Sequence, residues 1–385
     1  MKPLRILYVH HNADTYGASR SLLRLAGGLR RERYVPLVLL AENGPLKAKL
    51  EAIGVEVIVR PVSVITRPVF HSWRIIPFLL ALPVSVFHIW RLIRDRRIDV
   101  VHTNTGVIVS SGLAAKLARV PHVWHIRDWF QEFKGLWSYY ARYLLWSATR
   151  VLAVSRAVAG QFPKSEKVSV IHNGFSPEEF AVPKEELRRE FRARFNLNQE
   201  FVVGCVGRIK WVRKGQEILV RAASLLDKKG LCAKYLIVGA PFPGNESHLE
   251  DLFRLIRDLK LESRFVLTGE LADPRPAYAA MDLFVLPSAQ PEPFGGVVME
   301  AMSMGLPVVA TGIGGSLDQV ADSETGFLVP PSDPCVLAEK IELLMKDDAL
   351  RARMAQAAPE RIAQHFSLEC MARRIEQVYE QVLAR

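Results

Sequence analysis

Two glutamates, Glu292 and Glu300, enclose a glycine-containing turn in the segment QPEPFGGVVME. Carboxylates at this spacing could act as acid and base, as metal ligands, or as acceptors for substrate hydroxyls. Residues 295–305 have a helix pattern, and Glu300 falls about one turn into it, with its side chain leaning toward the helix start. Gly295 and Gly296 leave the first N–H groups open to an anion. Both carboxylates could border one cavity, or serve only as a turn residue and a helix-dipole charge.

Two further segments have features of anion sites. In GRIKWVRKGQEILV, Arg208 and Lys214 flank a loop that enters a helix near Gly215. Two converging cations suit a diphosphate, since charge-assisted hydrogen bonds contribute roughly 1.5–3 kcal/mol each. In YGASRSLLRLA, Gly17 precedes a helix whose first N–H groups could also bind an anion. The alternatives are a solvated basic loop and an ordinary strand-to-helix turn.

Motifs for metals and for common nucleotide sites do not occur in the chain. There is no GxGxxG after the first strand, no GxxxxGK[ST] and no DxD. Four histidines (His10, His11, His122, His125) lack helical ligand spacing, and His122 and His125 would point to opposite faces of a strand. The four cysteines lie far apart, which argues against disulfides and a zinc site and fits a reducing compartment. We therefore predict that no metal or other cofactor is required.

Short apolar strands alternate with amphipathic helices along most of the chain, which predicts parallel sheets covered on both faces. We expect an α/β protein with two doubly wound Rossmann-like domains facing across a cleft, where ligands bind at the carboxyl ends of the strands. The domains would span 1–172 and 201–365, with a linker at 173–200. The amphipathic helix 366–385, with Ser367 as its N-cap, would pack back onto the first domain. The predicted strands are 4–10, 35–41, 55–59, 99–103, 122–126, 150–154, 168–171, 201–207, 234–239, 264–268, 282–286, 307–310 and 326–329.

Positive charge is concentrated in the first half of the chain. The 385 residues carry a net +11, but residues 1–190 hold 28 Lys+Arg against 15 Asp+Glu. This half should attract an anionic partner. Nucleic acid is not expected, because no zinc finger, RRM core or aromatic-rich basic ribbon is present. No signal peptide is recognised at the start, so a cytoplasmic location is expected.

The segment RIIPFLLALPVSVFHIWRLIRDRRID, residues 74–99, is unusually apolar and then basic. The stretch from Ile75 to Trp90 is interrupted by Pro77 and Pro83, and we expect it to be too short to span a bilayer. Residues 74–97 could rest on the cytoplasmic face of an anionic membrane, with the arginines at the head groups. The alternative is a crossover helix packed on the sheet. The membrane interpretation implies a lipid-linked acceptor.

Four motifs in order resemble the retaining nucleotide-sugar glycosyltransferases of family 4, which have the GT-B fold. They are EPFGGVVME followed by AMSMGLPVVATGIGG, GRIKWVRKG, VSVIHNGFSPEEF and ETGFLVPPSDP. The resemblance covers nearly the whole chain and is strongest in the second half. It implies metal-independent transfer of a hexose from a donor such as a UDP- or GDP-hexose to a glycan or a lipid-linked acceptor, as in polysaccharide or glycolipid synthesis.

The resemblance also implies roles for individual residues. Glu292 would hold hydroxyls of the transferred sugar beside the reacting carbon, and Glu300 would accept from the ribose. Arg208 and Lys214 would neutralise the departing diphosphate. The other implied donor contacts are Gly17, Thr268, Gly269, Leu271, Phe294, Gly295, Gly296 and Val297. Retention would follow a front-face displacement in which the departing phosphate takes the acceptor proton, so no protein nucleophile is assigned.

In the first domain, HVWHIRDWF resembles the family's strand-end histidine segment. His125 would lie near the donor sugar and count with Glu292 as catalytic, although a satisfied core histidine is the alternative. Asp128, Arg127 and Asn173 would lie on the acceptor side.

Two other classes of function remain open from the sequence. One is a sugar-nucleotide epimerase or hydrolase on the same fold. The other is a non-catalytic, two-lobed sugar-nucleotide-binding protein. A glycosidase is not expected, because its two carboxylates must flank the bond, whereas Glu292 and Glu300 come from one strand-to-helix junction.

Overall fold

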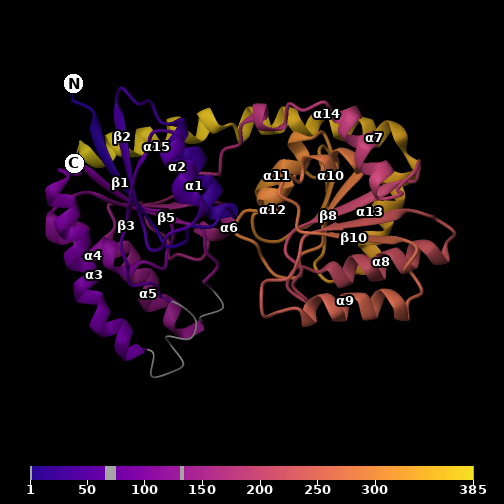
Figure 1. Cartoon of the computed structure of the whole chain (residues 1–385), viewed down its shortest axis with the longest axis horizontal. Coiled ribbons are helices and arrows are strands. Elements are labelled where there is room, and N and C mark those ends of the chain that lie inside the picture. The colour runs from indigo at the N-terminus through magenta and orange to yellow at the C-terminus, as the bar shows by residue number, and fades with distance from the viewer. Residues whose placement is uncertain (1, 66–74, 131–133, 385) are drawn as a thin grey trace. The chain divides into compact units, whose positions relative to one another are not determined.

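The computed structural model describes residues 2–65, 75–130 and 134–384 (Figure 1). The chain divides into two compact units, one made of residues 1–174 and 368–385 and the other of residues 175–367. Each unit has its own parallel sheet with helices on both faces, which confirms the prediction of two Rossmann-like α/β domains.

The first unit contains a seven-stranded parallel sheet in the order β3-β2-β1-β4-β5-β6-β7. Its central strands are buried along most of their length: the first two are mainly apolar, and the next two also bury His102, Thr103, His122 and His125 among apolar residues. The strands are β1 (Leu4–His10), β2 (Tyr34–Leu40), β3 (Glu56–Val59), β4 (Val100–Thr103), β5 (His122–Ile126), β6 (Arg150–Ala153) and β7 (Val168–Val170).

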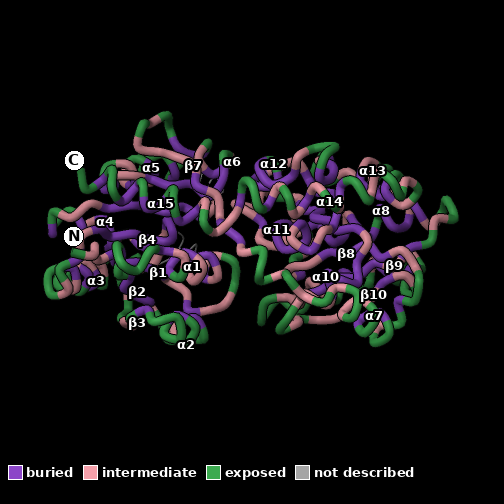
Figure 2. The backbone as a smooth tube through the Cα atoms, turned by 90° about the horizontal axis from the view of Figure 1, so that it is seen from above, coloured by how far each residue is buried: buried purple, intermediate pink, exposed green. Residues whose placement is uncertain are grey.

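Two groups of helices cover this sheet. Helices α1 (Gly17–Gly28), α2 (Pro45–Ala52) and α15 (Leu368–Leu383) contribute to one core, and α3 (Ile75–Asp95) and α4 (Val109–Ala118) to the other. The burial pattern in Figure 2 shows the strands between these layers. The C-terminal helix α15 thus belongs to the first unit, where Ile375 and Tyr379 are fully buried. The remaining helices are α5 (Lys134–Ser147) and α6 (Arg156–Ala159).

The second unit contains a six-stranded parallel sheet in the order β10-β9-β8-β11-β12-β13. Helices α7, α10, α11 and α14 contribute to the core on one face, and α8, α9 and α13 to the core on the other. The strands are β8 (Val202–Val206), β9 (Lys234–Val238), β10 (Phe265–Gly269), β11 (Leu283–Leu286), β12 (Val308–Thr311) and β13 (Gly326–Val329). The helices are η3 (Pro177–Phe180), α7 (Lys184–Arg194), α8 (Gln216–Lys228), α9 (Ser247–Asp258), α10 (Arg275–Ala280), α11 (Gly296–Ser303), α12 (Ser316–Gln319), α13 (Pro334–Lys346) and α14 (Asp348–His365).

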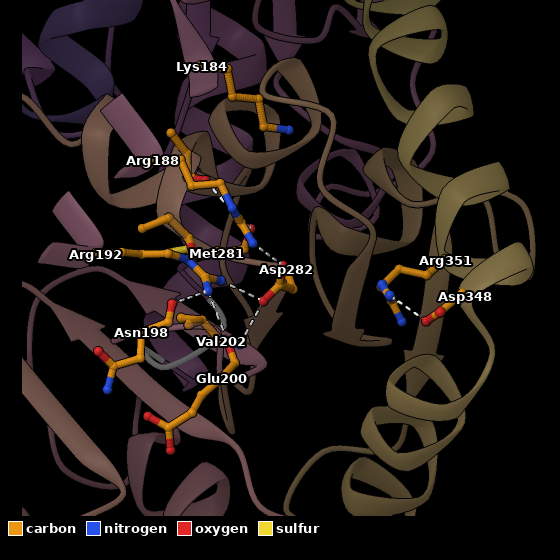
Figure 3. A network of polar contacts seen from close by, with 12 residues as sticks. Lys184, Arg188, Arg192, Asn198, Glu200, Val202, Met281, Asp282, Asp348 and Arg351 are labelled. Carbon is orange, nitrogen blue, oxygen red and sulfur yellow. Dashed lines mark hydrogen bonds and ion pairs between the residues drawn. The ribbon is translucent and has the colours of Figure 1, made fainter. Parts of the chain in front are cut away.

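The segment that we expected to be a linker, residues 173–200, is mostly part of the second unit. Helix α7 is tied to the start of β11 by Asp282, which accepts from Arg188 at 2.6 Å and from Arg192 at 2.8 Å (Figure 3). The same carboxylate accepts from the backbone N–H of Val202, the first residue of β8. One partly buried aspartate therefore connects α7 to two strands, which a charged sequence alone does not indicate.

All thirteen predicted strands are confirmed, each with boundaries within one residue of the prediction. The expectation that residues 75–90 are too short to span a bilayer was wrong. They form part of α3, a 21-residue helix that is long and apolar enough to cross a membrane by length and composition, with a mean hydropathy of 1.8 over its most apolar window. A helix of that length spans ~31 Å, similar to the ~30 Å hydrocarbon core of a bilayer. The predicted interruptions at Pro77 and Pro83 do not end the helix.

Candidate active site

The second unit has a topological switch point between β8 and β11. Chain connections run outward from these two neighbouring strands in opposite directions, which leaves a crevice at their carboxyl ends. Gly207 and Arg208 follow β8, and Ser288 follows β11. The segments that carry the predicted cations and Glu292 therefore start at the same edge of the sheet.

Glu292 and Lys214 form an ion pair at this edge, with Nζ 2.7 Å from Oε2. The Ser288 hydroxyl donates to the other carboxylate oxygen. Burial alone would raise the pKa of Glu292, but the charge of Lys214 and the hydrogen bonds from Lys214 and Ser288 hold it below its usual value. Glu292 is therefore ionised and fixed in orientation at neutral pH.

The loop from Arg208 to Gly215 is held in place by its surroundings. The Arg208 carbonyl accepts from Gln216, and its guanidinium lies over the Phe242 ring, 5.1 Å from the centroid. Gly215 has a φ of +69°, and a Cβ there would meet the Pro287 carbonyl at 1.8 Å. Only glycine fits this position, so the close approach of the two strand-end loops explains the glycine after Lys214.

Glu300 lies in the second turn of α11 and is only 5% exposed. The Tyr278 hydroxyl, from α10, donates to Glu300 Oε2 at 2.9 Å. One oxygen of the carboxylate is thus oriented by a buried tyrosine. A carboxylate group accepts hydrogen bonds, which is the chemistry required for binding a vicinal diol.

The start of α11 is built from Phe294, Gly295, Gly296 and Val297. Gly295 occupies the N-cap and has no side chain to cap the helix, so the first N–H groups do not bond to the N-cap residue's side chain and could bind an anion. Gln319 donates to the Gly295 carbonyl at 2.8 Å, and the Phe294 ring packs 5.9 Å from that of Phe366. The backbone at the start of α11 is therefore held in place.

Gly314 and Gly315, after β12, brace the backbone of Glu292. The Gly315 N–H donates to the Glu292 carbonyl at 2.8 Å. Gly314 has a φ of +64°, and a Cβ there would lie 2.3 Å from the same carbonyl oxygen. The GIGG segment thus packs directly against the backbone of the glutamate that forms the ion pair with Lys214.

Thr268, Gly269 and Leu271 lie at the same edge of the sheet, but two strands away from β8. Gly269 ends β10, and its carbonyl accepts from the Gly239 N–H at 2.8 Å. The Thr268 hydroxyl donates to that same carbonyl at 2.9 Å. These residues are partly buried.

The first unit has an equivalent switch point between β1 and β4, where polar side chains gather at the strand ends. Arg127 donates to Asn104 at 2.8 Å and also to Asn173. Asn173 accepts from Ser21 as well. Burial lowers the pKa of Arg127 to about 9. Arg127 and Asn173, predicted on the acceptor side, are thus brought together.

A relay of hydrogen bonds leads from Arg127 to the C-terminal helix. His125 Nδ1 lies 3.3 Å from an Arg127 nitrogen and 3.2 Å from His102 Nε2, and His102 Nδ1 lies 2.8 Å from the Tyr379 hydroxyl. The Tyr379 hydroxyl lies 2.7 Å from that of Tyr8. Because arginine only donates, His125 Nδ1 must accept; His102 Nε2 then donates, and Tyr379 donates to His102.

This direction leaves the proton of neutral His125 on Nε2. Burial, followed by the charge of Arg127, holds the pKa of His125 well below its usual value, while the Ile171 carbonyl acts in the opposite direction. The imidazole is fully buried. His125 therefore lies between Arg127 and His102 in a buried network, and its assignment as a catalytic residue stays a prediction.

Asp128 and Gly17 occupy contrasting positions. Asp128 accepts from the Gly106 N–H at 2.8 Å and from the Thr105 hydroxyl at 3.0 Å, so it braces the loop after β4. Gly17 is the first residue of α1, and a Cβ there would have none of the described atoms within 4 Å. Space therefore exists beside the start of α1, as an anion site requires.

Several residues that orient the side chains of the site were not identified from the sequence. Ser288 and Tyr278 orient the two glutamates, and Tyr379 closes the histidine relay from the far end of the chain. The only signal for Gly314 was its place in the GIGG segment. Among the described residues, no group of three or more His, Cys, Asp or Glu side chains is arranged to hold a metal ion.

Comparison with known proteins matches each half of the chain to a glycosyltransferase family model. The model "Glycosyltransferase Family 4" matches residues 15–179, and "Glycosyl transferases group 1" matches residues 188–361. Together they account for most of the chain.

Similar proteins carry related descriptions. The capsular polysaccharide biosynthesis glycosyltransferase CapM of Staphylococcus aureus is 28% identical over 73% of this chain and 78% of its own length. The D-inositol 3-phosphate glycosyltransferase of Corynebacterium diphtheriae is 37% identical, over 46% of this chain and 42% of its own. The chain thus spans less than half of that second relative.

Among solved structures, the Anabaena protein Alr3699/HepE in complex with UDP superposes with a TM-score of 0.83 and 26% identity, covering 98% of this chain and 100% of that one. The fold and both family matches agree with the resemblance carried by the sequence motifs. The chain is therefore a glycosyltransferase that belongs to family 4 and has the GT-B fold.

Proposed function

We propose that this protein is a retaining hexosyltransferase that moves a sugar from a nucleoside diphosphate to a hydroxyl of a glycan or a lipid-linked acceptor. The observation that carries the proposal is the Lys214–Glu292 pair at the β8/β11 switch point, beside the uncapped start of α11. It combines a carboxylate that can hold sugar hydroxyls with a cation and helix N–H groups suited to phosphate.

In the proposed reaction, the bond between the anomeric carbon and the β-phosphate oxygen breaks. A bond from the same carbon to the acceptor oxygen forms on the same face, and the acceptor proton passes to the departing phosphate. Lys214, Arg208 and the first N–H groups of α11 stabilise the charge that grows on the diphosphate. These groups supply the stabilisation without a metal ion, so metal independence is part of the proposal.

The two glutamates and the residues at the strand ends have separate roles in this proposal. Glu292 holds hydroxyls of the transferred sugar next to the anomeric carbon, and Glu300, oriented by Tyr278, accepts from the ribose. Thr268, Gly269 and Leu271, which lie at the same edge of the sheet two strands from β8, are proposed to bind the nucleobase. In the first unit, the strand-end cluster around Arg127 and Asn173 is proposed to bind the acceptor.

A UDP-hexose is proposed as the donor in preference to a GDP-hexose. Support comes from Alr3699/HepE, which has been solved with UDP-glucose and is 26% identical to this chain. The description of CapM supports an acceptor in cell-surface polysaccharide synthesis. Peripheral association of α3 with the cytoplasmic face of a membrane belongs to the same proposal.

A thermal-shift comparison of UDP-, GDP-, ADP- and TDP-sugars tests the donor, because a ligand that binds only the folded state raises the Tm. We expect one nucleotide series to raise the Tm and the matching sugar to be transferred with retention, as followed by NMR of the product. Release of free sugar at the full rate without any acceptor would instead indicate a hydrolase. If no nucleotide sugar binds, the proposal is wrong.

A further inference from the structure

Helix α3 carries a continuous apolar stripe that faces solvent. Ile76, Leu80, Val84 and Phe87 are all exposed, and Leu80 is 73% exposed. Their spacing of four, four and three residues places them on one side of the helix. The most apolar window of α3 is only 11% buried, whereas a core helix of this composition would be mostly buried.

The first half of α3 projects beyond the rest of its layer (Figure 1). The packed part of α3 begins at Ser85. Its hydroxyl accepts from the Ser63 N–H and donates to Ser110 in the first turn of α4. None of residues 75–84 is buried, whereas Ile89 and Ile93 are core residues. The ten projecting residues extend ~15 Å past this point. They stand at the carboxyl edge of the sheet, where the Arg127 cluster lies.

Helix α5 adds exposed apolar residues at the same edge. Tyr140 lies at this edge, because its hydroxyl donates to the carbonyl of Gly106, which follows the end of β4. Leu136 and Tyr139 precede it in the chain, and Tyr139 is 70% exposed. Helix α4 contacts both α3 and α5, so the two exposed helices flank it (Figure 2).

Arginines continue the stripe of α3. Arg91 and Arg94 follow Phe87 at spacings of four and three residues and are exposed, as is Arg142 on α5. The first unit as a whole carries 28 Lys+Arg against 13 Asp+Glu. An apolar surface followed by exposed cations complements a bilayer whose surface is anionic, with acyl chains beyond the head groups.

A membrane-spanning helix and a second copy of the chain both fit the stripe less well than a bilayer surface. A membrane span would place the two ends of α3 on opposite sides of the bilayer, but β3 and β4, which flank α3, belong to the same sheet. A second copy of the chain would bring the arginines of both copies together, which like-charge repulsion opposes. A bilayer surface meets neither objection.

We propose that residues 75–94 of α3, together with Leu136 and Tyr139 of α5, form a docking surface for an anionic phospholipid bilayer. The projecting turns of α3 insert among the lipids, and Arg91, Arg94 and Arg142 contact head-group phosphates. The carboxyl edge of the first sheet is thereby held at the membrane surface. The binding itself is independent of catalysis, but its use in presenting a lipid-linked acceptor rests on the proposed function.

Vesicle sedimentation with the full chain, without donor or acceptor, tests the docking. We expect binding to vesicles of phosphatidylcholine with phosphatidylglycerol at low salt, and weaker binding to phosphatidylcholine alone. The triple change Ile76→Ser, Leu80→Ser, Val84→Ser should weaken it by at least about tenfold for each residue, with an unchanged Tm because these residues are unburied. The matched control is Phe253→Ser with Leu343→Ser, exposed apolar residues of the second unit.

Charge reversal tests the head-group contacts. Arg94→Glu with Arg142→Glu should weaken binding by at least about fivefold per arginine, whereas Arg221→Glu with Arg353→Glu, exposed in the second unit, should leave binding unchanged. Raised salt should act in the same direction as reversal. Equal binding to uncharged vesicles, or no loss in the serine variant, would refute the proposal.

The outcomes separate this inference from the proposed function. Nucleotide-sugar binding without vesicle binding leaves the transferase proposal intact and rejects the docking surface. Vesicle binding without nucleotide-sugar binding supports the docking surface and rejects the transferase proposal. Concentration-dependent dimerisation that the serine variant abolishes, measured by sedimentation velocity, would show that a second copy covers the stripe and that the bilayer assignment is wrong.

Discussion

Lys214 and Glu292, 78 positions apart, meet with Nζ 2.7 Å from Oε2 at the switch point of the second sheet. The pair joins the loop after β8 to the loop after β11. The Ser288 hydroxyl donates a hydrogen bond to the other oxygen of the carboxylate. A phosphate group that binds Lys214 would share it with Glu292, so the cation proposed to hold the leaving group also orients the proposed sugar-binding acid. The two roles are thus coupled through one ammonium group.

Glu292→Gln should lower kcat by about a hundredfold or more, in line with the loss of one preorganised polar contact. Steady-state kinetics with the cognate acceptor measure this loss. Glu300→Ala is the informative comparison, because it should mainly weaken donor binding and raise KM. Near-full turnover in Glu292→Gln would show that the carboxylate has no role beside the reacting carbon.

Arg208→Ala combined with Lys214→Ala should abolish measurable binding of the nucleoside diphosphate. Each lost charge-assisted hydrogen bond contributes roughly 1.5–3 kcal/mol, so the combined loss is about a hundredfold to ten-thousandfold in Kd. Isothermal titration calorimetry with UDP gives the measurement. Lys210→Ala, an exposed cation in the same loop, is the control and should bind normally. Unchanged affinity in the double variant would reject the phosphate loop.

The fold was predictable because its signals are local. Runs such as LRILYVH and FVVGCVG are nearly continuous in apolar residues, a pattern typical of strands that are buried on both faces. The boundary of the linker was not predictable. Helix α7 has the charged composition of a solvated segment, yet Arg188 and Arg192 are bound to Asp282, a residue about 90 positions later. Ion pairs between distant segments leave no trace in periodicity.

The candidate site was predictable only where motif residues carry it. Glu292, Lys214 and Glu300 stand in recognisable segments, whereas Tyr278 is one apolar-looking residue of RPAYAA. The spacing of residues 122–126 placed His125 on a strand but could not show that its side chain is fully buried. Burial and hydrogen-bond direction depend on neighbours from β4 and α15, which come together only in three dimensions.

Val212→Asn should stabilise the protein by about 1 kcal/mol, because the left-handed conformation costs a β-branched residue roughly 1–2 kcal/mol and Asn tolerates it. Val212 has a φ of +65° and is 53% exposed, so little burial is lost. Urea unfolding measures the change. Val35→Asn, an exposed valine in strand β2, should be destabilising under the same conditions. Equal losses in both variants would mean that Val212 carries no strain.

Gly314→Ala should lower kcat by displacing the backbone of Glu292, whose carbonyl oxygen lies 2.3 Å from the position of the new Cβ. The left-handed φ adds a cost in stability of about 1 kcal/mol. Gly312→Ala is the matched control two residues earlier, since a Cβ there meets only ordinary contacts at 3.7 Å or more. Kinetics at a temperature well below the Tm separate the two effects. Equal kcat in both variants would show that Gly314 does not position Glu292.

Acid should destabilise the first unit through its buried histidines. Burial holds the pKa of His10, His102 and His125 well below the usual value and lowers that of His122 to about 3. Each histidine is neutral when folded and binds a proton on unfolding below its ordinary pKa of about 6.5. Their contribution to stability is therefore complete above that pH and is lost as the pH falls, by about 1.4 kcal/mol per pH unit for each histidine. Urea unfolding between pH 5 and pH 7, roughly the range of this titration, measures the slope. His122→Gln should remove one histidine's share of it, and an unchanged slope in that variant would show that His122 is not buried in its neutral form.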